Sequence, residues 1–213
     1  PPSDKIKTRG GPGAVVEAVS GPVANPKSIA GAIRVLKQFS PEFAKKVKSP
    51  LIHNTSLEAL FKIVKSGGLK GLTSDVRPSP GKLKDLGSVS LTRSMKTDIP
   101  IAEPKNVKMI YDTEDIRKIG KLEPYSWGYR HDEVKFAGPS GKVAAIDEAE
   151  EVFRQVGKQI PIIPNDILRG LVIRGGSQFP SDKAFGHLSQ LNVPTVLTPR
   201  ATQMMLLKGY SFK

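Results

Sequence analysis

The 213-residue chain has no cysteine and one tryptophan, and it has no apolar run near the ~20 residues that a membrane-spanning helix needs. The lack of thiols excludes disulfides and thiolate metal sites. The segment after Pro1 lacks the charged and then apolar pattern of a signal peptide. We therefore expect an intracellular protein that is not secreted through a signal peptide, has no membrane contact and binds no metal.

Acidic residues are scarce relative to basic ones. The sequence has 33 Lys and Arg against 20 Asp and Glu, a formal net charge of +13. Such a balance favours an acidic partner, which is either a nucleic acid, an acidic protein surface or the interior of a nucleic-acid container. The length suits one domain with extensions that buries a core without covalent crosslinks.

The N-terminal part of the chain divides into two segments. Residues 1–26 are rich in Gly, Pro, Ser and Ala and have too little apolar periodicity to fold alone, so they are predicted to form a flexible basic arm. In residues 27–48, Ile29, Ile33 and Leu36 recur at helical spacing, which predicts a helical extension of two short helices. The pattern fits packing on the rest of the chain and packing on another chain equally well.

A strand, a turn and a helix are predicted around a histidine. Residues 51–55 read Leu-Ile-His-Asn-Thr, an apolar helical pattern follows, and Thr55 with Glu58 forms a capping box. His53 is then placed beside the free backbone N–H groups of a helix N-terminus, where a ribose or a phosphate can bind. An ordinary histidine at a strand end remains the alternative.

Two later segments also combine strand patterns with polar groups. Residues 87–94 read Gly-Ser-Val-Ser-Leu-Thr-Arg-Ser, and residues 147–153 read Asp-Glu-Ala-Glu-Glu-Val-Phe. In a strand, Glu148 and Glu150 share one face and Glu151 takes the other, but the register is open by one residue. The same acidic run also fits the first turn of a helix.

The remaining chain alternates between short elements and loops. Strands are predicted at 107–111, 170–174 and 195–197, an acidic helical turn at 112–119, an exposed aromatic-rich loop at 121–141, and helices at 181–191 and 199–208. The apolar run Met-Met-Leu-Leu in the last helix suits either ordinary packing or contact with a partner subunit.

A histidine strand, a Ser-x-Thr strand and a strand led by glutamates, in that order, resemble the ADP-ribosyltransferase fold over residues 51–173. The resemblance is nearest to divergent transferase-like domains of bacteriophage-encoded proteins, which show the same order of "SLTR" and "EAEE". It implies an α+β fold with a split β-sheet core and flanking helices at 49–176. A C-terminal helix-strand-helix extension is expected over 177–213.

The resemblance also implies NAD as a substrate and gives roles to individual residues. Those assigned to NAD binding are His53, Thr55, Ser90, Thr92, Arg93 and Tyr111. Arg93 is expected to donate to the pyrophosphate, and a surface ion-pair residue is the alternative. The second strand lacks the tyrosine common in histidine-type enzymes, so Tyr111, Tyr125 and Tyr129 are candidates to stack on nicotinamide.

The resemblance assigns catalysis to the glutamates. Glu150 is expected to stabilise the ribosyl cation as nicotinamide leaves, and Glu148 is expected to position the acceptor. Glu151 is the substitute for Glu150 because of the open register.

Two functions are consistent with these features. The first is a mono-ADP-ribosyltransferase that transfers ADP-ribose from NAD to a protein or nucleic-acid acceptor in the cytoplasm of an infected host cell. The second is a non-catalytic component of a phage virion, acting in the head, in ejection or in assembly. Such a component would retain the fold and contact DNA or partner subunits.

Overall fold

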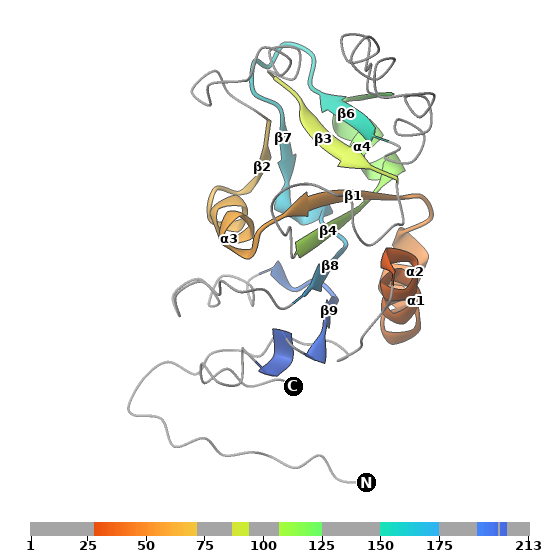
Figure 1. The fold of residues 1–213 in the computed structure, drawn as a ribbon. Coiled ribbons are helices and arrows are strands. Elements are labelled where there is room, and N and C mark those ends of the chain that lie inside the picture. Colours follow the sequence, from red (N-terminus) through yellow and green to blue (C-terminus); the bar gives the residue numbers. More distant parts are fainter. Residues whose placement is uncertain are drawn as a thin grey trace, which may run out of the picture.

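A mixed sheet of seven strands forms the centre of the computed structural model, which describes residues 28–71, 87–93, 107–124, 150–174, 191–199 and 201–203 (Figure 1). The strands are β1 (Pro50–Thr55), β3 (Val89–Thr92), β4 (Val107–Asp112), β5 (Lys121–Pro124), β6 (Glu150–Arg154), β8 (Gly170–Ile173) and β9 (Thr195–Leu197). Their order in the sheet is β5-β6-β3-β1-β4-β8-β9, and only β8 and β9 are parallel. The predicted α+β class is confirmed.

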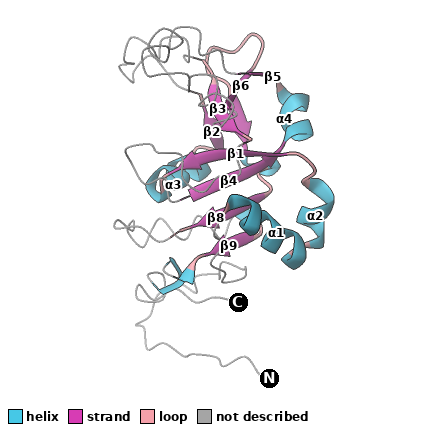
Figure 2. Ribbon diagram, turned by 45° about the vertical axis from the view of Figure 1, so that its right-hand side comes forward, coloured by secondary structure: helices cyan, strands magenta, loops and turns pink. Residues whose placement is uncertain are grey.

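Two N-terminal helices cover one face of this sheet. α1 (Ile29–Phe39) begins at the cap Ser28, and α2 (Pro41–Lys46) begins at the cap Ser40. Their buried side chains form one cluster with apolar residues of four strands, namely Ile52, Ile110, Val172 and Val196. Figure 2 shows both helices beside β8 and β9. The predicted helical extension therefore packs on the sheet.

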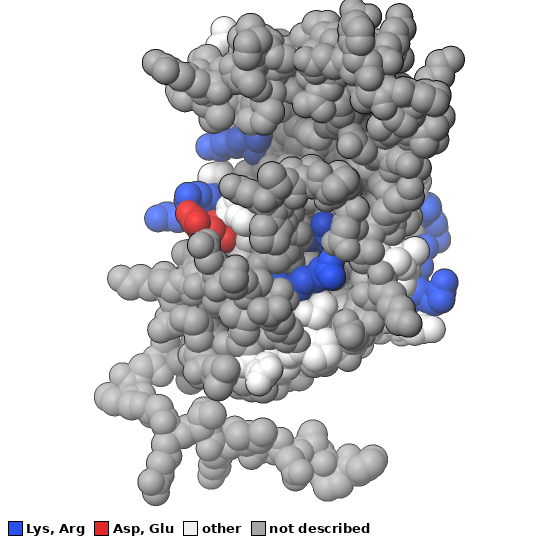
Figure 3. Space-filling model, viewed as in Figure 1, with Lys and Arg blue, Asp and Glu red and all other residues white. Residues whose placement is uncertain are grey.

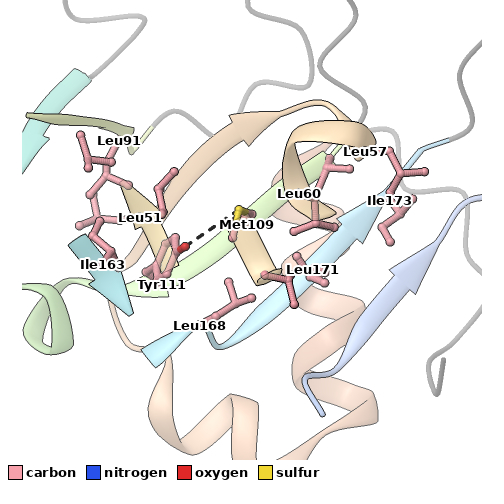
Figure 4. Packing of buried hydrophobic residues seen from close by; sticks show 14 of the residues in the cluster. Leu51, Leu57, Leu60, Leu91, Met109, Tyr111, Ile163, Leu168, Leu171 and Ile173 are labelled. Carbon is pink, nitrogen blue, oxygen red and sulfur yellow. Dashed lines mark hydrogen bonds between the residues drawn. The ribbon is translucent and has the colours of Figure 1, made fainter. Parts of the chain in front are cut away.

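The other face is covered by a helix and a second, two-stranded sheet. α3 (Leu57–Lys65) follows β1 directly, and β2 (Gly68–Lys70) pairs with β7 (Ile162–Pro164). A short 3-10 helix, η2 (Asn165–Ile167), leads from β7 toward β8. These elements enclose the larger core cluster, part of which Figure 4 shows.

α4 (Thr113–Ile119) connects β4 to β5 at the end of the sheet where β1 begins. Asp112 caps this helix, since its Oδ1 accepts the backbone N–H of Glu114 at 3.0 Å. The acidic helical turn predicted over 112–119 is therefore confirmed, with Asp112 as the last residue of β4.

Most predicted elements are found close to their expected positions. The strands predicted at 51–55, 107–111, 170–174 and 195–197 are β1, β4, β8 and β9. The glutamate segment forms a strand, β6, and not a helix. Because β9 pairs with β8, the segment after residue 176 contributes a strand to the same sheet.

Two local predictions were wrong. The segment predicted as a loop at 121–141 begins with β5, which pairs with β6 at the edge of the sheet. The cap of α3 is Ser56, whose Oγ accepts the N–H of Ala59 at 3.1 Å, whereas Thr55 remains in β1. Both serine and threonine suit a cap, and the strand pairing of Thr55 with Val107 decides between them.

Some predictions lie outside the described residues. They are the arm at 1–26, almost all of the helix at 181–191, the rest of the loop after residue 124, and the apolar run at 204–207. The helix predicted from residue 199 is described only for its first turn, where the Oγ1 of Thr198 accepts the N–H of Ala201 at 3.4 Å. Within the described part of the chain, no helix is long and apolar enough to cross a membrane.

Candidate active site

The three strands that carry the motif residues are neighbours in the sheet. β6 pairs with β3, and β3 pairs with β1, with Ile52 opposite Thr92. Segments about thirty to a hundred positions apart in the sequence are thus brought side by side. The histidine, Ser-x-Thr and glutamate motifs therefore belong to one continuous part of the fold.

His53 lies on the face of the sheet that α3 covers. In the β1–β4 ladder it pairs with Met109, whose side chain belongs to the core cluster under α3. Its Nδ1 lies 3.0 Å from the backbone carbonyl oxygen of Ser90. Because a carbonyl only accepts hydrogen bonds, Nδ1 carries the proton in this contact, and Nε2 of the neutral ring is an acceptor.

The predicted NAD-binding residues of β1 and β3 divide between the two faces of the sheet. Thr55 pairs with Val107 of the core under α3 and so shares the face of His53. Ser90 and Thr92 lie on the opposite face, since Thr92 pairs with Ile52 of the cluster under α1 and α2. Thr92 is buried and Ser90 is exposed. The structure does not bring these hydroxyls together with His53.

The register of β6 distinguishes the two described glutamates. Glu151 pairs with Leu91, and Glu150 pairs with Thr92. Leu91 belongs to the core cluster under α3, and directly paired residues occupy the same face of a sheet. Position 151 is therefore on the face of His53, and position 150 is on the opposite face. Glu148 lies outside the described residues.

Arg93 is held at the start of β1. Its Nη1 donates to Oγ of Ser49 at 2.9 Å and to Oγ1 of Thr113 at 3.1 Å. Ser49 is four positions before His53, roughly 13 Å along an extended strand. Asp112 fixes this end further, because its Oδ2 accepts the backbone N–H of Ser49 at 2.9 Å. Arg93 therefore lies toward the opposite end of β1 from Thr55.

Tyr111 belongs to the core and does not line a binding site. It is 1% exposed, and its hydroxyl donates to the sulfur of Met109 at 4.0 Å (Figure 4). Burial raises the pKa of Tyr111 well above its ordinary value. Its ring is enclosed by core side chains, so the predicted stacking on nicotinamide does not fit this position. Tyr125 and Tyr129 lie outside the described residues.

A hollow of about 240 Å³ lies elsewhere, between α2, η2 and residues 191–194. Phe43, Lys46 and Arg169 are among its lining residues, and none of the predicted site residues is. The structure brings no three His, Asp or Glu side chains of the described residues together in a group that could hold a metal ion.

Comparisons with known proteins give distant similarities to solved structures. No family model and no curated protein matches the chain. In fold the chain is similar to DarT of Thermus sp. 2.9 in complex with NAD+, at 10% identity and a TM-score of 0.41, over 71% of this chain and 96% of that one. The complex of DarT with ADP-ribosylated ssDNA gives 11% identity and a TM-score of 0.43, over 71% and 94%. This similarity concerns the fold, and the function is argued below from the residues of the chain itself.

Proposed function

We propose that the chain is an NAD-dependent mono-ADP-ribosyltransferase whose active site lies on the α3 face of β1, β3 and β6. The observation that carries the proposal is that the three motif strands are adjacent, with His53 and position 151 on one face. Two strand spacings of about 4.8 Å separate β1 from β6, roughly 10 Å in all. A dinucleotide, with two riboses joined by a pyrophosphate, can extend across such a distance.

His53 is proposed to bind a ribose of NAD. The contact with the carbonyl oxygen of Ser90 orients the ring and sets its tautomer, so Nε2 accepts a hydrogen bond from a ribose hydroxyl. Thr55 is on the same face, at the end of β1 from which α3 begins. Arg93, toward the other end of β1, is proposed to donate to the pyrophosphate from its anchored position.

The catalytic carboxylate is proposed to be that of Glu151, and the pairing of position 151 with Leu91 on the face of His53 supports this choice. The bond between the ribose and the nicotinamide nitrogen breaks, and its electron pair leaves with nicotinamide. A carboxylate then stabilises the cation that develops on the ribose. The acceptor nucleophile forms the new bond to the same carbon and releases its proton to solvent. Position 150 is on the other face of the sheet. We therefore assign stabilisation of the ribosyl cation to Glu151 and not to Glu150, the residue first expected from the sequence.

The acceptor is proposed to be a nucleic acid. The formal net charge of +13 favours a polyanion over a neutral surface. Among the described residues, Figure 3 shows Lys and Arg side chains at several places on one face and Asp and Glu side chains together at one place. An acidic protein surface is the alternative acceptor.

A calorimetric titration of the full chain with NAD, followed by measurement of released nicotinamide, tests the proposal. Binding heat, a thermal shift and slow release of nicotinamide are expected. The absence of heat and of a thermal shift at millimolar NAD would overturn the proposed site. Binding without any release would instead fit the non-catalytic virion component.

A further inference from the structure

The turn that leaves β6 exposes apolar side chains. Residues 155–161 connect β6 to β7 and read Gln-Val-Gly-Lys-Gln-Ile-Pro. Val156 is 93% exposed and Ile160 is 40% exposed, and Phe39 on α1 is the other large apolar side chain that is exposed in the described part of the chain. Two of these three side chains thus belong to one seven-residue turn.

Hydrogen bonds fix the shape of this turn. Gln155 donates through Nε2 to the carbonyl oxygen of Ile119 at 3.2 Å, and its Oε1 accepts the N–H of Ile162 at 2.9 Å. Within the turn, the N–H of Lys158 donates to the carbonyl oxygen of Gln155 at 3.2 Å. Gly157 adopts φ 75°, which glycine reaches without strain. The exposure of Val156 is therefore built into the fold.

Cations lie in this turn and on the strand pair that leads into it. Lys158 is exposed in the turn itself, and Arg154 precedes the turn and pairs with Lys121 on the edge strand β5. Lys121 and Arg154 share one carboxylate, Glu123, whose oxygens lie 2.5 Å and 3.9 Å from their nitrogens. The hydrogen bond from Lys121 lowers the pKa of Glu123, which keeps this carboxylate charged. Residues 121–123 and 154–160 thus hold three cations and one carboxylate.

We propose that this surface, called here the turn patch (Lys121, Arg154, Val156, Lys158 and Ile160), docks single-stranded nucleic acid. Phosphates meet the cations. The aliphatic side chains of Val156 and Ile160 bury apolar surface against the face of an unpaired base. A duplex hides its base faces in the stack, so a single strand fits the patch better. The role of the patch in holding an acceptor rests on the transferase proposed above, whose site also lies along β6. Binding of a single strand to the patch does not require catalysis.

Fluorescence anisotropy with a labelled oligothymidine and the full chain tests the patch. Lys158→Glu should weaken binding about tenfold at low salt and reduce the slope of log affinity against log salt by about 0.7. Lys65→Glu, a matched charge reversal at the exposed end of α3, should leave affinity nearly unchanged. Val156→Ser should lower affinity about threefold, because it removes apolar contact area with the base. It should not change the salt slope or the unfolding temperature, because the side chain is almost fully exposed in the free protein.

The patch would be contradicted by an absence of binding at low salt, by equal losses in Lys158→Glu and Lys65→Glu, or by equal affinity for duplex DNA. Preference for poly-glutamate over oligothymidine would also overturn it and favour an acidic protein partner. Nicotinamide release without acceptor should be the same in Lys158→Glu and in the unmodified chain. Oligothymidine binding with no NAD cleavage in the unmodified chain would overturn the transferase and still support the patch.

Discussion

The imidazole of His53 lies 3.0 Å, through Nδ1, from the backbone carbonyl oxygen of Ser90 on the neighbouring strand. The partner is a main-chain atom. The ring is therefore oriented by the pairing of β1 with β3 and not by the side chain of residue 90. The Ser90 hydroxyl lies on the opposite face. The position of the His53 ring, a candidate ligand-binding group, therefore depends on β3 being the neighbour of β1 in the sheet.

Substitution at these two positions should have different effects on NAD binding. His53→Ala removes the ring and should weaken NAD affinity about tenfold, which corresponds to about 1.4 kcal/mol. Ser90→Ala keeps the carbonyl and should leave affinity unchanged. Calorimetry of both variants checks this. Equal losses would mean that the Ser90 hydroxyl contacts NAD, as the sequence motif suggested.

The burial of Tyr111 should appear as a loss of stability at alkaline pH. Its pKa is raised in the folded state, so the stabilisation is complete below the unfolded value near 10 and declines as the pH rises above it. Tyr111→Phe should keep stability within about 1 kcal/mol at neutral pH, because the bond to the Met109 sulfur is weak. Above pH ~10 the variant should lose less stability than the parent in urea unfolding. If the unmodified chain and Tyr111→Phe lose stability equally above pH ~10, the hydroxyl of Tyr111 is not buried.

An ion pair fastens α4 to the segment before β8. Arg169 donates through Nε and Nη2 to Oδ2 of Asp115 at 2.8 and 2.5 Å, and both side chains are largely buried. Partial burial raises the pKa of Asp115, but hydrogen bonds from Arg169 and Lys118 outweigh it and hold this pKa below the usual value. The pair should therefore stabilise the fold above pH ~4 and lose its effect as the pH falls through the lower folded value.

Asp115→Asn should lower the free energy of unfolding at neutral pH by about 1–3 kcal/mol and should flatten the loss of stability in acid. Glu58→Gln is the control, because its partner Lys62 and Glu58 itself are exposed on α3, and little change is expected there. Urea unfolding across pH measures both variants. If Asp115→Asn loses stability in acid as the unmodified chain does, the Asp115–Arg169 pair does not contribute the proposed stabilisation.

Truncation should separate the arm from the helices that follow it. Removal of residues 1–27 leaves α1 and α2 intact, so the unfolding temperature should stay close to that of the full chain. Removal of residues 1–48 uncovers the apolar face that includes Ile52, Ile110 and Val172, and this variant should aggregate or unfold well below the full chain. Equal stability of the two truncated proteins would show that the helices are dispensable.

The elements with strong local patterns could be predicted from the sequence. β1, β4 and β8 combine apolar runs with clear ends, and α1 and α3 show helical spacing. β2 and β7 have three residues each, too few for alternation to appear. β5 ends at Pro124 and resembles a loop until β6 is placed beside it.

The three motif segments could be predicted as strands from the sequence, but the faces that their residues occupy could not. The order of motifs in the chain placed His53, Ser90 and Glu150 in one group. Pairing between strands decides the faces, and it puts Ser90 and position 150 opposite to His53. A shift of one residue in β6 exchanges Glu150 with Glu151, and no feature of the local sequence fixes that register.

Nicotinamide release from NAD by Glu151→Gln and Glu150→Gln, compared with the unmodified chain, tests the central claim most directly. Both substitutions keep size and remove one charge from neighbouring positions of β6, so each is the control for the other. The account predicts that Glu151→Gln slows release about 100-fold or more with NAD affinity nearly unchanged, and that Glu150→Gln remains close to the unmodified chain. The reverse order, or release that neither substitution affects, would contradict it.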